Sequence, residues 1–363
     1  MQIYKIVLTG GPCAGKTTTL NAVSKYLKEK QIPVVTVPET ATELIINGMT
    51  PNAENIYGFQ NLVLKRQLAK EKDALEYVQK NFANYDKCVI IYDRGICDNA
   101  AYLNDPKDFQ KLLSENGLNE TWVLDDYDLV LDLLSLAVCK KEAYNLNNVA
   151  RTETAEQAAI IDTKTSNAWA KHHNLKLLSS KVSLEEQIKT VIDYINNLLN
   201  ENENQEKVRY LVNVSKSNLN IYQNNESIKA IEFHFGVGLP DNYHFVITKR
   251  ANYYCYILEI YQEIDNKRIT IIRKNIDYDK FNYMQSNYQY LKYDKSEKYF
   301  VANQTLYKLI WFEDKVFIEI QNNTASKEYI LPEGIVIYHN EDIEIQNHAD
   351  DIRNYVKKLI LKK

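Results

Sequence analysis

The sequence predicts a chain of two domains, an α/β domain with a parallel sheet followed by an antiparallel β domain. Up to about residue 200, short apolar segments alternate with long amphipathic ones, which is typical of βαβ units. A glycine-rich segment, LTGGPCAGKTTTL, directly follows the first apolar segment. Beyond about residue 206, apolar residues recur at every second position, as in strands that bury one face. These three observations together predict the fold class.

The N-terminal domain, residues 1–200, is expected to contain five parallel strands. These strands are expected at residues 3–8, 34–37, 88–92, 129–134 and 175–178. The helical spacing of apolar residues between them predicts helices that cover the sheet on both faces. Ser183 and Glu186 have the spacing of a capping box, which predicts that a helix begins there and runs to about Leu199.

The second domain, residues 206–363, follows a linker, NNLLNENENQEK, that is rich in Asn and Glu. Alternating segments such as YHFVITKR, RITIIRK and YKLIWF are separated by polar turns, and they predict an antiparallel meander. The segment HADDIRNYVKKLIL predicts a short helix that ends the domain.

The composition is that of a soluble globular chain, because 45% of the 363 residues are apolar and 25% are charged. A net charge of −4 gives no general electrostatic case for nucleic acid, so no nucleic-acid partner is expected. The five cysteines include no C-x-x-C pair, which argues against a disulfide framework or a zinc knuckle. The first apolar segment, IYKIVL, is too short for a membrane span. We therefore expect a cytoplasmic protein without a transmembrane segment.

Residues 10–17, GGPCAGKT, match the pattern G-x-x-x-x-G-K-[ST] of a loop that holds nucleotide phosphates. Backbone N–H groups of such a loop converge on phosphate oxygens at the start of a helix, where the helix dipole also favours anions. Lys16 is expected to reach the β- and γ-phosphates, and the Thr17 hydroxyl to bind Mg²⁺. The residues expected to bind ATP or GTP are Gly10, Gly11, Pro12, Cys13, Ala14, Gly15, Lys16, Thr17 and Thr18.

The segment VIIYDRG, residues 89–95, places an acid at the carboxyl end of an apolar strand, where ligands of open α/β sheets gather. Asp93 is therefore the expected second ligand of Mg²⁺. Arg94 could contact substrate or phosphate, or could pair with a carboxylate, and the sequence leaves both roles open. Asp98, one helical turn later, is expected to be a helix cap rather than a ligand.

Two further segments carry candidate catalytic residues beside Lys16 and Asp93. Glu39, in VPETATEL, follows the second strand and could act as a base or hold a metal-bound water; the alternative is a helix cap or a solvated acid. Arg151, in EAYNLNNVARTET, follows the fourth strand and could close on the transferring phosphoryl group as part of a mobile lid. The same segment also has the composition of a helix start.

The second domain carries adjacent cations in two of its strands. In ITKRANYY, strand alternation puts Lys249 and Arg250 on opposite faces, and in ITIIRKN it separates Arg273 from Lys274 in the same way. Each strand can therefore send one cation into a shared concave face, which would suit a phosphate-rich anion or a lipid headgroup. The alternative is an ordinary solvated strand face.

Several of these segments together resemble the P-loop domain of bacterial nicotinamide-riboside-kinase-type regulators and of the translocation-defect GTP-binding proteins. They are GGPCAGKTT, VPETATELI, VIIYDRGICDNAAY, YDLVLDL and YNLNNVARTETAEQA. The second family is the closer resemblance, through Tyr144, Asn147, Asn148, Arg151, Thr152 and Glu153 and through a C-terminal β domain similar to CYTH domains of the triphosphate-tunnel kind. The resemblance is strong to about residue 175 and weaker after residue 206.

The resemblance implies a kinase-like P-loop NTPase fold followed by a CYTH-like antiparallel β barrel. It also implies binding of a nucleotide, GTP in that family, and of phosphatidic acid, with a peripheral location at membranes. The sequence departs from the pattern of these families in two places. QEKVRYLV keeps Glu206 and Arg209 but lacks the acid pair of the E-x-E-x-K strand in catalytic tunnel enzymes, so hydrolysis is not expected in the second domain. No [NT]-K-x-D segment follows the fourth strand, so ATP and GTP both stay open.

The sequence therefore predicts a nucleotide-binding protein with slow NTPase activity and a second domain that binds an anionic phospholipid or polyphosphate. The alternative is a small-molecule kinase that transfers the γ-phosphoryl group to a nucleoside-like acceptor, with Glu39 or Asp93 activating the acceptor hydroxyl. The discriminating feature is an acceptor pocket beside the phosphate loop.

Overall fold

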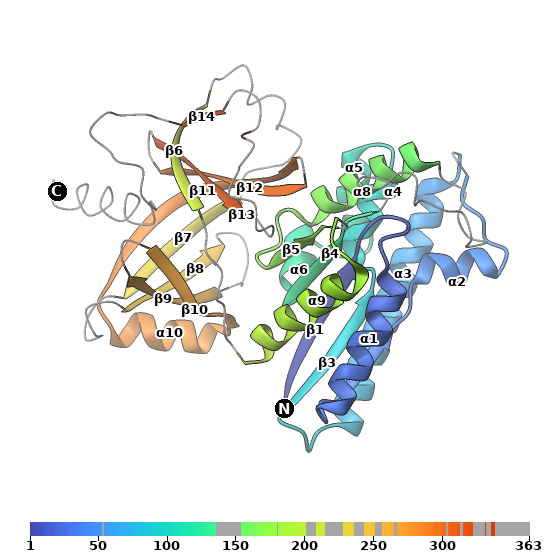
Figure 1. The fold of residues 1–363 in the computed structure, drawn as a ribbon, viewed down its shortest axis with the longest axis horizontal. Coiled ribbons are helices and arrows are strands. Elements are labelled where there is room, and N and C mark those ends of the chain that lie inside the picture. The colour runs from blue at the N-terminus through green and yellow to red at the C-terminus, as the bar shows by residue number, and fades with distance from the viewer. Residues whose placement is uncertain are drawn as a thin grey trace. The chain divides into compact units, whose positions relative to one another are not determined.

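The computed structural model contains two compact units, Met1–Leu199 and Asn200–Lys363 (Figure 1). The described residues are 1–52, 54–135, 154–179, 181–200, 208–214, 228–235, 243–250, 256–264, 267–302, 304–312, 315–321, 331 and 335–337. Arg151 and the helix expected at the end of the second domain lie outside the described residues.

The N-terminal unit contains a five-stranded parallel sheet in the order β2-β3-β1-β4-β5. Its strands are β1 (Gln2–Thr9), β2 (Val34–Val37), β3 (Lys87–Asp93), β4 (Leu129–Leu133) and β5 (Leu175–Leu178). The predicted parallel α/β sheet is confirmed. The connection that follows β1 runs to β2, at one edge of the sheet. The connection that follows the neighbouring strand β3 runs in the opposite direction, to β4. The two connections therefore change direction at the adjacent strands β1 and β3. In open α/β sheets ligands bind at such a switch point.

Helices cover both faces of this sheet. They are α1 (Lys16–Glu29), α2 (Thr40–Ile46), α3 (Ile56–Asn81), α4 (Asn99–Tyr102), α5 (Pro106–Glu115), α6 (Glu120–Asp125), α8 (Ala155–Trp169) and α9 (Leu184–Leu199), with a 3₁₀ turn η1 at Ile96–Asp98. The predicted capping box opens α9: the Glu186 N–H donates to the Ser183 hydroxyl at 3.2 Å, and the Ser183 N–H donates to the Glu186 carboxylate at 3.1 Å.

The core of this unit forms where α1 and α9 pack against one face of the sheet, as Figure 1 shows. Leu8 of β1, Leu27 of α1 and Ile195 of α9 belong to one buried cluster. Burying each such side chain contributes about 1.5–3 kcal/mol. Val7, on the opposite face of β1, lies toward Gly95 and Trp169, at the start of η1 and the end of α8.

The C-terminal unit contains a nine-stranded antiparallel sheet in the order β10-β9-β8-β7-β11-β12-β13-β6-β14. Its elements are β6 (Val208–Val214), β7 (Ile228–Phe235), β8 (Tyr243–Arg250), β9 (Tyr256–Ile264), β10 (Lys267–Ile276), α10 (Tyr278–Asn287), β11 (Tyr290–Ala302), β12 (Thr305–Phe312), β13 (Lys315–Gln321) and β14 (Ile335–Ile337). The predicted antiparallel domain is confirmed. The described strands form an open sheet with β10 and β14 at its edges, rather than a closed barrel.

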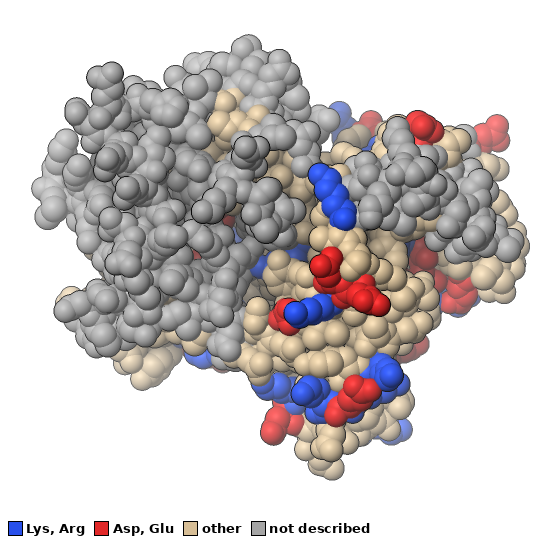
Figure 2. Space-filling model, viewed as in Figure 1, with Lys and Arg blue, Asp and Glu red and all other residues tan. Residues whose placement is uncertain are grey.

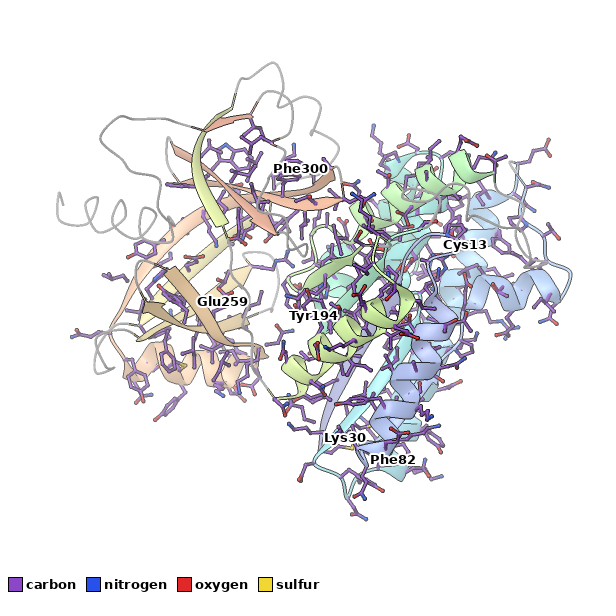
Figure 3. All side chains as sticks on the ribbon, in the orientation of Figure 1. Cys13, Lys30, Phe82, Tyr194, Glu259 and Phe300 are labelled. Atoms are coloured by element: carbon purple, nitrogen blue, oxygen red, sulfur yellow. The ribbon has the colours of Figure 1, made fainter. Side chains whose placement is uncertain are left out.

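The two faces of this antiparallel sheet differ in chemistry. One face is apolar and holds Leu258, Phe300 and Ile318 in its core clusters. The other face carries charged residues that the strand register brings together. Its charged residues with described side chains are Glu232, Arg250, Glu259, Lys295, Glu297, Lys308 and Glu319. Figure 3 labels Glu259 of this charged face and Phe300 of the apolar face.

Ion pairs join the charged face at its centre. The Lys295 ammonium lies 2.6 Å from the Glu297 carboxylate and also pairs with Glu232, and the Lys308 ammonium lies 2.8 Å from Glu297. Burial by itself would raise the pKa of Glu297, but Lys295 and Lys308 outweigh burial and lower that pKa to about 2. The carboxylate is therefore ionised inside the protein, held by two cations.

Glu297→Gln should destabilise the C-terminal unit by about 3 kcal/mol or more, because it leaves buried cations without their shared anion. The native pKa of about 2 lies below the ordinary 4.5, so this contribution is complete above pH 4.5 and is lost as the pH falls toward 2. Hydrogen exchange of the β11 and β12 amides measures the change.

The matched control is Asp294→Asn on the same strand. Asp294 is exposed and lies 3.9 Å from the exposed Lys292, so its removal should change stability by at most about 0.5 kcal/mol. Equal exchange rates in the Glu297 and Asp294 variants would contradict the proposed role of the buried pair.

Candidate functional site

A pocket of about 320 Å³ lies at the carboxyl ends of β1 and β3, the switch point of the parallel sheet. The loop between β1 and α1 forms one wall, and residues from α2, α3, the end of β3 and α4 form the rest. Figure 3 labels Cys13 in that loop, at the opposite end of the unit from Lys30 and Phe82.

Glycine gives the loop the shape that wraps a phosphate. Gly15 caps α1 with φ 81°, in the left-handed region that glycine adopts without strain. Gly10 has φ 135°, and a Cβ atom there would lie 2.0 Å from the Leu133 carbonyl oxygen of β4. The loop can pass over the sheet edge only because Gly10 has no side chain.

Lys16 begins α1 and lies along the inside of the loop. Its ammonium donates to the carbonyl oxygens of Gly10 and Gly11, both at 2.9 Å. Burial and the neighbouring Arg94 lower the pKa of Lys16 to about 8, although nearby carboxylates act in the opposite direction. Lys16 is therefore mostly charged at neutral pH and can exchange two carbonyl partners for phosphate oxygens.

Asp93 lies where the sequence predicted a metal ligand. It ends β3 directly beside Leu8 of β1, and its Oδ1 atom is buried without a hydrogen-bond partner. Burial raises its pKa. Thr17, exposed in the first turn of α1, lines the same pocket. An orphaned carboxylate oxygen and a nearby hydroxyl fit Mg²⁺, which keeps several waters and needs only one or two protein ligands beside phosphate.

No group of three or more His, Cys, Asp or Glu side chains that could hold a metal occurs among the described residues. A magnesium ion that arrives with a nucleotide does not require such a group, because phosphate and water supply most of its ligands.

Arg94 resolves the choice that the sequence left open, since it pairs with carboxylates. Its Nε atom donates to Glu39 at 2.6 Å and its Nη1 atom donates to Asp98 at 3.1 Å. Its backbone has φ 69°, an uncommon conformation for a non-glycine residue that here turns the side chain into the pocket. Such backbone strain clusters at functional sites.

Glu39 stands at the start of α2 but does not cap it, because its carboxylate accepts no backbone N–H of that helix. It accepts instead from the Thr42 hydroxyl at 2.9 Å and from Arg94. Burial would raise the pKa of Glu39, but Arg94, Lys16 and the Thr42 hydrogen bond together lower it. Glu39 is therefore an ionised carboxylate that lines the pocket between the loop and α3.

Asp98 stands directly before α4, and its carboxylate makes no cap hydrogen bond to that helix but has other partners. It accepts from the Gly95 N–H at 2.9 Å, from the Trp169 indole N–H at 3.2 Å and from the Thr9 hydroxyl. Together with Arg94, these donors leave the carboxylate fully engaged. A residue expected only to begin a turn thus fixes the position of the pocket arginine.

Two buried acids behind the loop were not predicted as site residues. Asp162 of α8 accepts from the Gly11 N–H and from the Ser135 N–H, both at 2.9 Å. Asp132 of β4 accepts from the Ser166 hydroxyl at 2.5 Å. Burial and the proximity of each acid to the other raise the pKa of Asp132, and burial raises that of Asp162. An acid inside the apolar strand segment VLDL was the available signal for Asp132.

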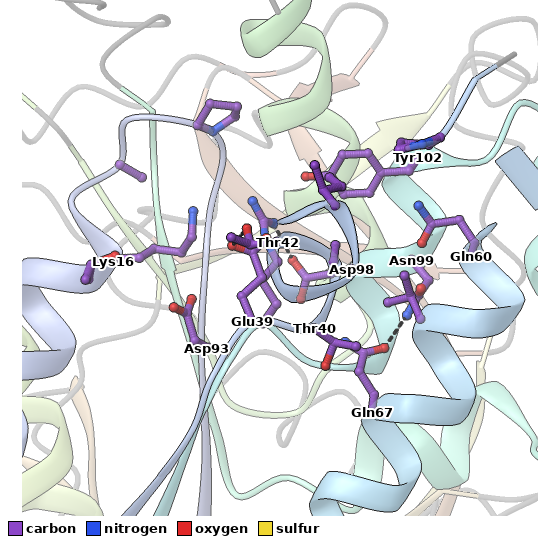
Figure 4. Close-up of a pocket in the computed structure, with 18 of the residues that line it drawn as sticks. Lys16, Glu39, Thr40, Thr42, Gln60, Gln67, Asp93, Asp98, Asn99 and Tyr102 are labelled. Atoms are coloured by element: carbon purple, nitrogen blue, oxygen red, sulfur yellow. Dashed lines mark hydrogen bonds and ion pairs between the residues drawn. The ribbon is translucent and has the colours of Figure 1, made fainter. Parts of the chain in front are cut away.

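The far part of the pocket was also missed. Figure 4 shows it: Lys16 and Asp93 lie on one side of Glu39, and Gln60, Asn99 and Tyr102 lie on the other. We call this far part the amide chamber, defined by Phe59, Gln60, Gln67, Asn99 and Tyr102. The helical spacing of Gln60 and Gln67 on α3 was visible in the sequence, but their partner helix was not.

The cations predicted for the second domain lie on both faces of its sheet. Arg250 is buried on the charged face, with its guanidinium 5.8 Å from the Tyr299 ring. Arg273 stands opposite Glu259 in the register of β10 and β9, and its side chain lies outside the described residues. Lys249 and Lys274 are half-buried and belong to the other face.

Figure 2 shows acidic and basic side chains interspersed on the visible, described surface of the N-terminal unit, without a broad basic area. No described helix is both long and apolar enough to cross a membrane.

Comparison with known proteins assigns the N-terminal unit to a protein family. The profile of the AAA_28 family, described as an AAA domain, matches residues 5–187. No curated protein sequence matches the chain. One solved structure, a Pyrococcus horikoshii OT3 protein, is 12% identical with a TM-score of 0.28, over 34% of this chain and 80% of that chain. Another, a conserved hypothetical protein from Pyrococcus furiosus, is 16% identical with a TM-score of 0.27, over 33% and 80%.

Both TM-scores lie below 0.5, the range in which two structures do not share a fold. The family match spans half of the chain and includes the phosphate loop, Asp93 and the amide chamber. The chain therefore belongs to the AAA-domain family, and its N-terminal unit is a P-loop nucleotide-binding domain.

Proposed function

We propose that the protein is a small-molecule kinase that transfers the γ-phosphoryl group of ATP or GTP to a hydroxyl of a nucleoside-like acceptor. The observation that carries the proposal is the continuity of the pocket. It runs from Lys16 and Asp93 past Glu39 into the amide chamber, so one cavity offers a phosphate site and an acceptor site. A domain that only binds and slowly hydrolyses a nucleotide does not need the acceptor site.

In the proposed reaction, the acceptor oxygen forms a bond to the γ-phosphorus while the bond from that phosphorus to the β–γ bridging oxygen breaks. The nucleoside diphosphate leaves, and the hydroxyl proton passes to a carboxylate or to water. Mg²⁺, when held by Thr17 and Asp93, would neutralise charge on the phosphate oxygens. Lys16 would contact the transferring end of the triphosphate.

Glu39 is the carboxylate best placed to orient the acceptor hydroxyl, because it lies between the phosphate loop and the amide chamber. Its lowered pKa makes it a weak base. Phosphoryl transfer passes through a loose transition state in which positioning matters more than proton removal, so a weak base suffices. Arg94, anchored on both Glu39 and Asp98, fixes that orientation.

The finer identity of the chain stays a prediction. The resemblance to translocation-defect GTP-binding proteins and to CYTH domains extends beyond the family match, as does phosphatidic acid as a ligand. The anion site predicted at Lys249, Arg250, Arg273 and Lys274 also stays a prediction, and of these cations Arg250 lies on the charged face beside Lys295 and Lys308. The ion pairs of Lys295 and Lys308 with Glu297 favour a structural role instead.

Lys16→Ala should weaken binding of fluorescent ATP and GTP analogues about tenfold or more, because a charge-assisted hydrogen bond is worth about 1.5–3 kcal/mol. Since binding uses the charged form and the pKa is about 8, the affinity of the parent should fall as the pH rises through that value. The affinity of the Lys16→Ala variant should not show this fall with pH. Lys25→Ala, exposed on the same helix, is the control and should bind as the parent does.

Asp93→Asn should leave the nucleotide bound but remove the dependence of binding on Mg²⁺ and abolish turnover, because the metal neutralises charge on the transferring group. Isothermal titration with and without EDTA, combined with assays of nucleoside diphosphate release, measures both effects. Asp86→Asn, exposed just before the same strand, is the control. Unchanged turnover in the Asp93 variant would move the metal role to another acid, first to Glu39.

A panel of hydroxyl compounds should contain at least one that accelerates nucleoside diphosphate release and appears as a phosphomonoester by mass spectrometry. Glu39→Gln should lower this stimulated rate by about 10²-fold, as expected for a group that acts on the attacking hydroxyl. Its affinity for the nucleotide should change little. Turnover that no compound in the panel accelerates would favour a nucleotide-dependent switch over a kinase.

A further inference from the structure

We propose that Gln60 and Asn99 select the acceptor, and that they select an uncharged nucleoside through an N–H or NH₂ group on its base. This inference rests on the proposed phosphoryl transfer and names the class of its substrate. It implies that nucleoside 5′-monophosphates, which share the base but carry a dianionic end, are rejected.

The Asn99 side chain has a buried acceptor to which no described residue donates. Asn99 is 2% exposed, and its Nδ2 group donates to Gln67 Oε1 at 2.7 Å and to the Ile96 carbonyl at 2.8 Å. Both amide hydrogens are thereby engaged. Its Oδ1 atom, which is buried and belongs to a residue that lines the pocket, has no hydrogen-bond partner. Buried acceptors are usually paired, and because this one belongs to a residue that lines the pocket, a donor group of a bound ligand can pair with it.

The orientation of both amides follows from the carbonyls around them. Gln67 Nε2 donates to the Gly95 carbonyl at 3.3 Å, which turns Gln67 Oε1 toward Asn99. Reversing Asn99 would place its oxygen against Gln67 Oε1 and the Ile96 carbonyl, and two acceptors cannot share a hydrogen. The free Asn99 atom is therefore an oxygen, and the complementary group of the ligand is a donor.

Gln60 supplies a second polar contact in the same chamber. It lies two turns before Gln67 on α3 and is 3% exposed, and no described residue makes a hydrogen bond to its side-chain amide. Figure 4 shows it on the same side of the pocket as Asn99 and Tyr102. Its amide offers one acceptor and two donors, so Gln60 and Asn99 together can read a planar edge that presents both kinds of group.

The charges of the pocket argue against a phosphorylated acceptor. Its charged lining residues are Lys16, Glu39, Asp93, Arg94 and Asp98, which comprise two cations and three acids. The Arg94 guanidinium is already engaged by Glu39 and Asp98. Lys16 lies at the phosphate loop. The described residues of the amide chamber are uncharged, and an acceptor phosphate placed there would lose its hydration without gaining a cation.

Apolar side chains complete the chamber and suit a ring. Phe59 and Val63 of α3 face the pocket together with Tyr102 of α4. Aromatic and apolar walls with a few polar groups are the usual lining of sites for small planar ligands. A base with its edge toward Gln60 and Asn99 would leave its sugar toward Glu39, which is where the reacting hydroxyl is needed.

The test uses the full chain with Mg²⁺ and ATP or GTP, and measures nucleoside diphosphate release with three sets of compounds. The sets are uncharged ribo- and deoxyribonucleosides, their 5′-monophosphates, and the polyols ribose and glycerol. We expect at least one nucleoside to accelerate release, its monophosphate to be at least tenfold poorer, and the analogue that is methylated on the base nitrogen to lose most of the effect.

Gln60→Met keeps the size of the side chain and removes its polar contacts. It should raise the KM for the nucleoside at least tenfold and raise the KM for the nucleotide far less. Gln79→Met, on the exposed side of the same helix, is the matched control and should change neither. The methylated analogue probes Asn99 without a substitution that could prevent folding.

The possible results are distinguishable. Acceleration by ribose or by the monophosphates equal to that by nucleosides, or an unchanged KM in Gln60→Met, would overturn this inference and leave the kinase proposal standing. If no compound accelerates release, both fail. Acceleration restricted to nucleosides, with the loss on methylation and in Gln60→Met, supports both.

Discussion

The carboxylate of Asp98 is the contact on which the candidate site depends. It gathers donors from the end of β1, the end of β3, the turn η1 and the last residue of α8. A buried carboxylate is stabilised only when its lone pairs are satisfied, so these four elements must converge for the charge to be tolerated. Arg94 is one of the four donors, and through Arg94 the same carboxylate sets the position of Glu39. The geometry of the pocket thus follows from the need to satisfy one negative charge.

Buried acids of the two units have different charged neighbours. On the charged face of the C-terminal sheet, Glu297 is paired with two lysines. In the N-terminal pocket, Asp93 and Asn99 each have a buried oxygen without a partner. Paired groups hold a fold together, whereas unpaired ones raise the free energy of the empty site and are relieved by a ligand. The ion pairs of Glu297 favour a structural role for the charged face, and the unpaired oxygens of two pocket-lining residues support the function proposed for the pocket.

Features that depend on neighbouring residues were predicted from the sequence, whereas features that depend on contacts between distant residues were not. The strands of the parallel sheet and the phosphate loop were predictable because apolar runs, a glycine pattern and a capping box each act within a few residues. The charged partners of Arg94 were left open, because Glu39 comes 55 residues earlier in the chain. Asn99 and Gln67 looked like ordinary polar helix residues. Their chemistry arises only where α3 meets the start of α4, a juxtaposition that no periodicity reports.

In the antiparallel unit, too, contacts between residues far apart in the sequence could not be predicted. Strand alternation predicted that one cation of each adjacent pair would turn to a common face, and the register places Arg250 on the charged face. Alternation could not supply Glu297 of that face, because it belongs to a strand whose neighbours are set by the order of the whole sheet.

The close packing of Trp169 against Gly95 determines when the candidate site can form during synthesis of the chain. A Cβ atom at this position would lie 2.7 Å from the Trp169 ring, so the indole fits closely over a bare backbone and donates to Asp98 from there. Trp169 ends a helix that the ribosome delivers about 75 residues after Gly95, at roughly 5–20 residues per second. Until that helix docks, Asp98 lacks one of its donors. The emerging chain can therefore form its glycine loop early, but it completes the cavity around Arg94 only several seconds later, after most of the domain has been synthesised.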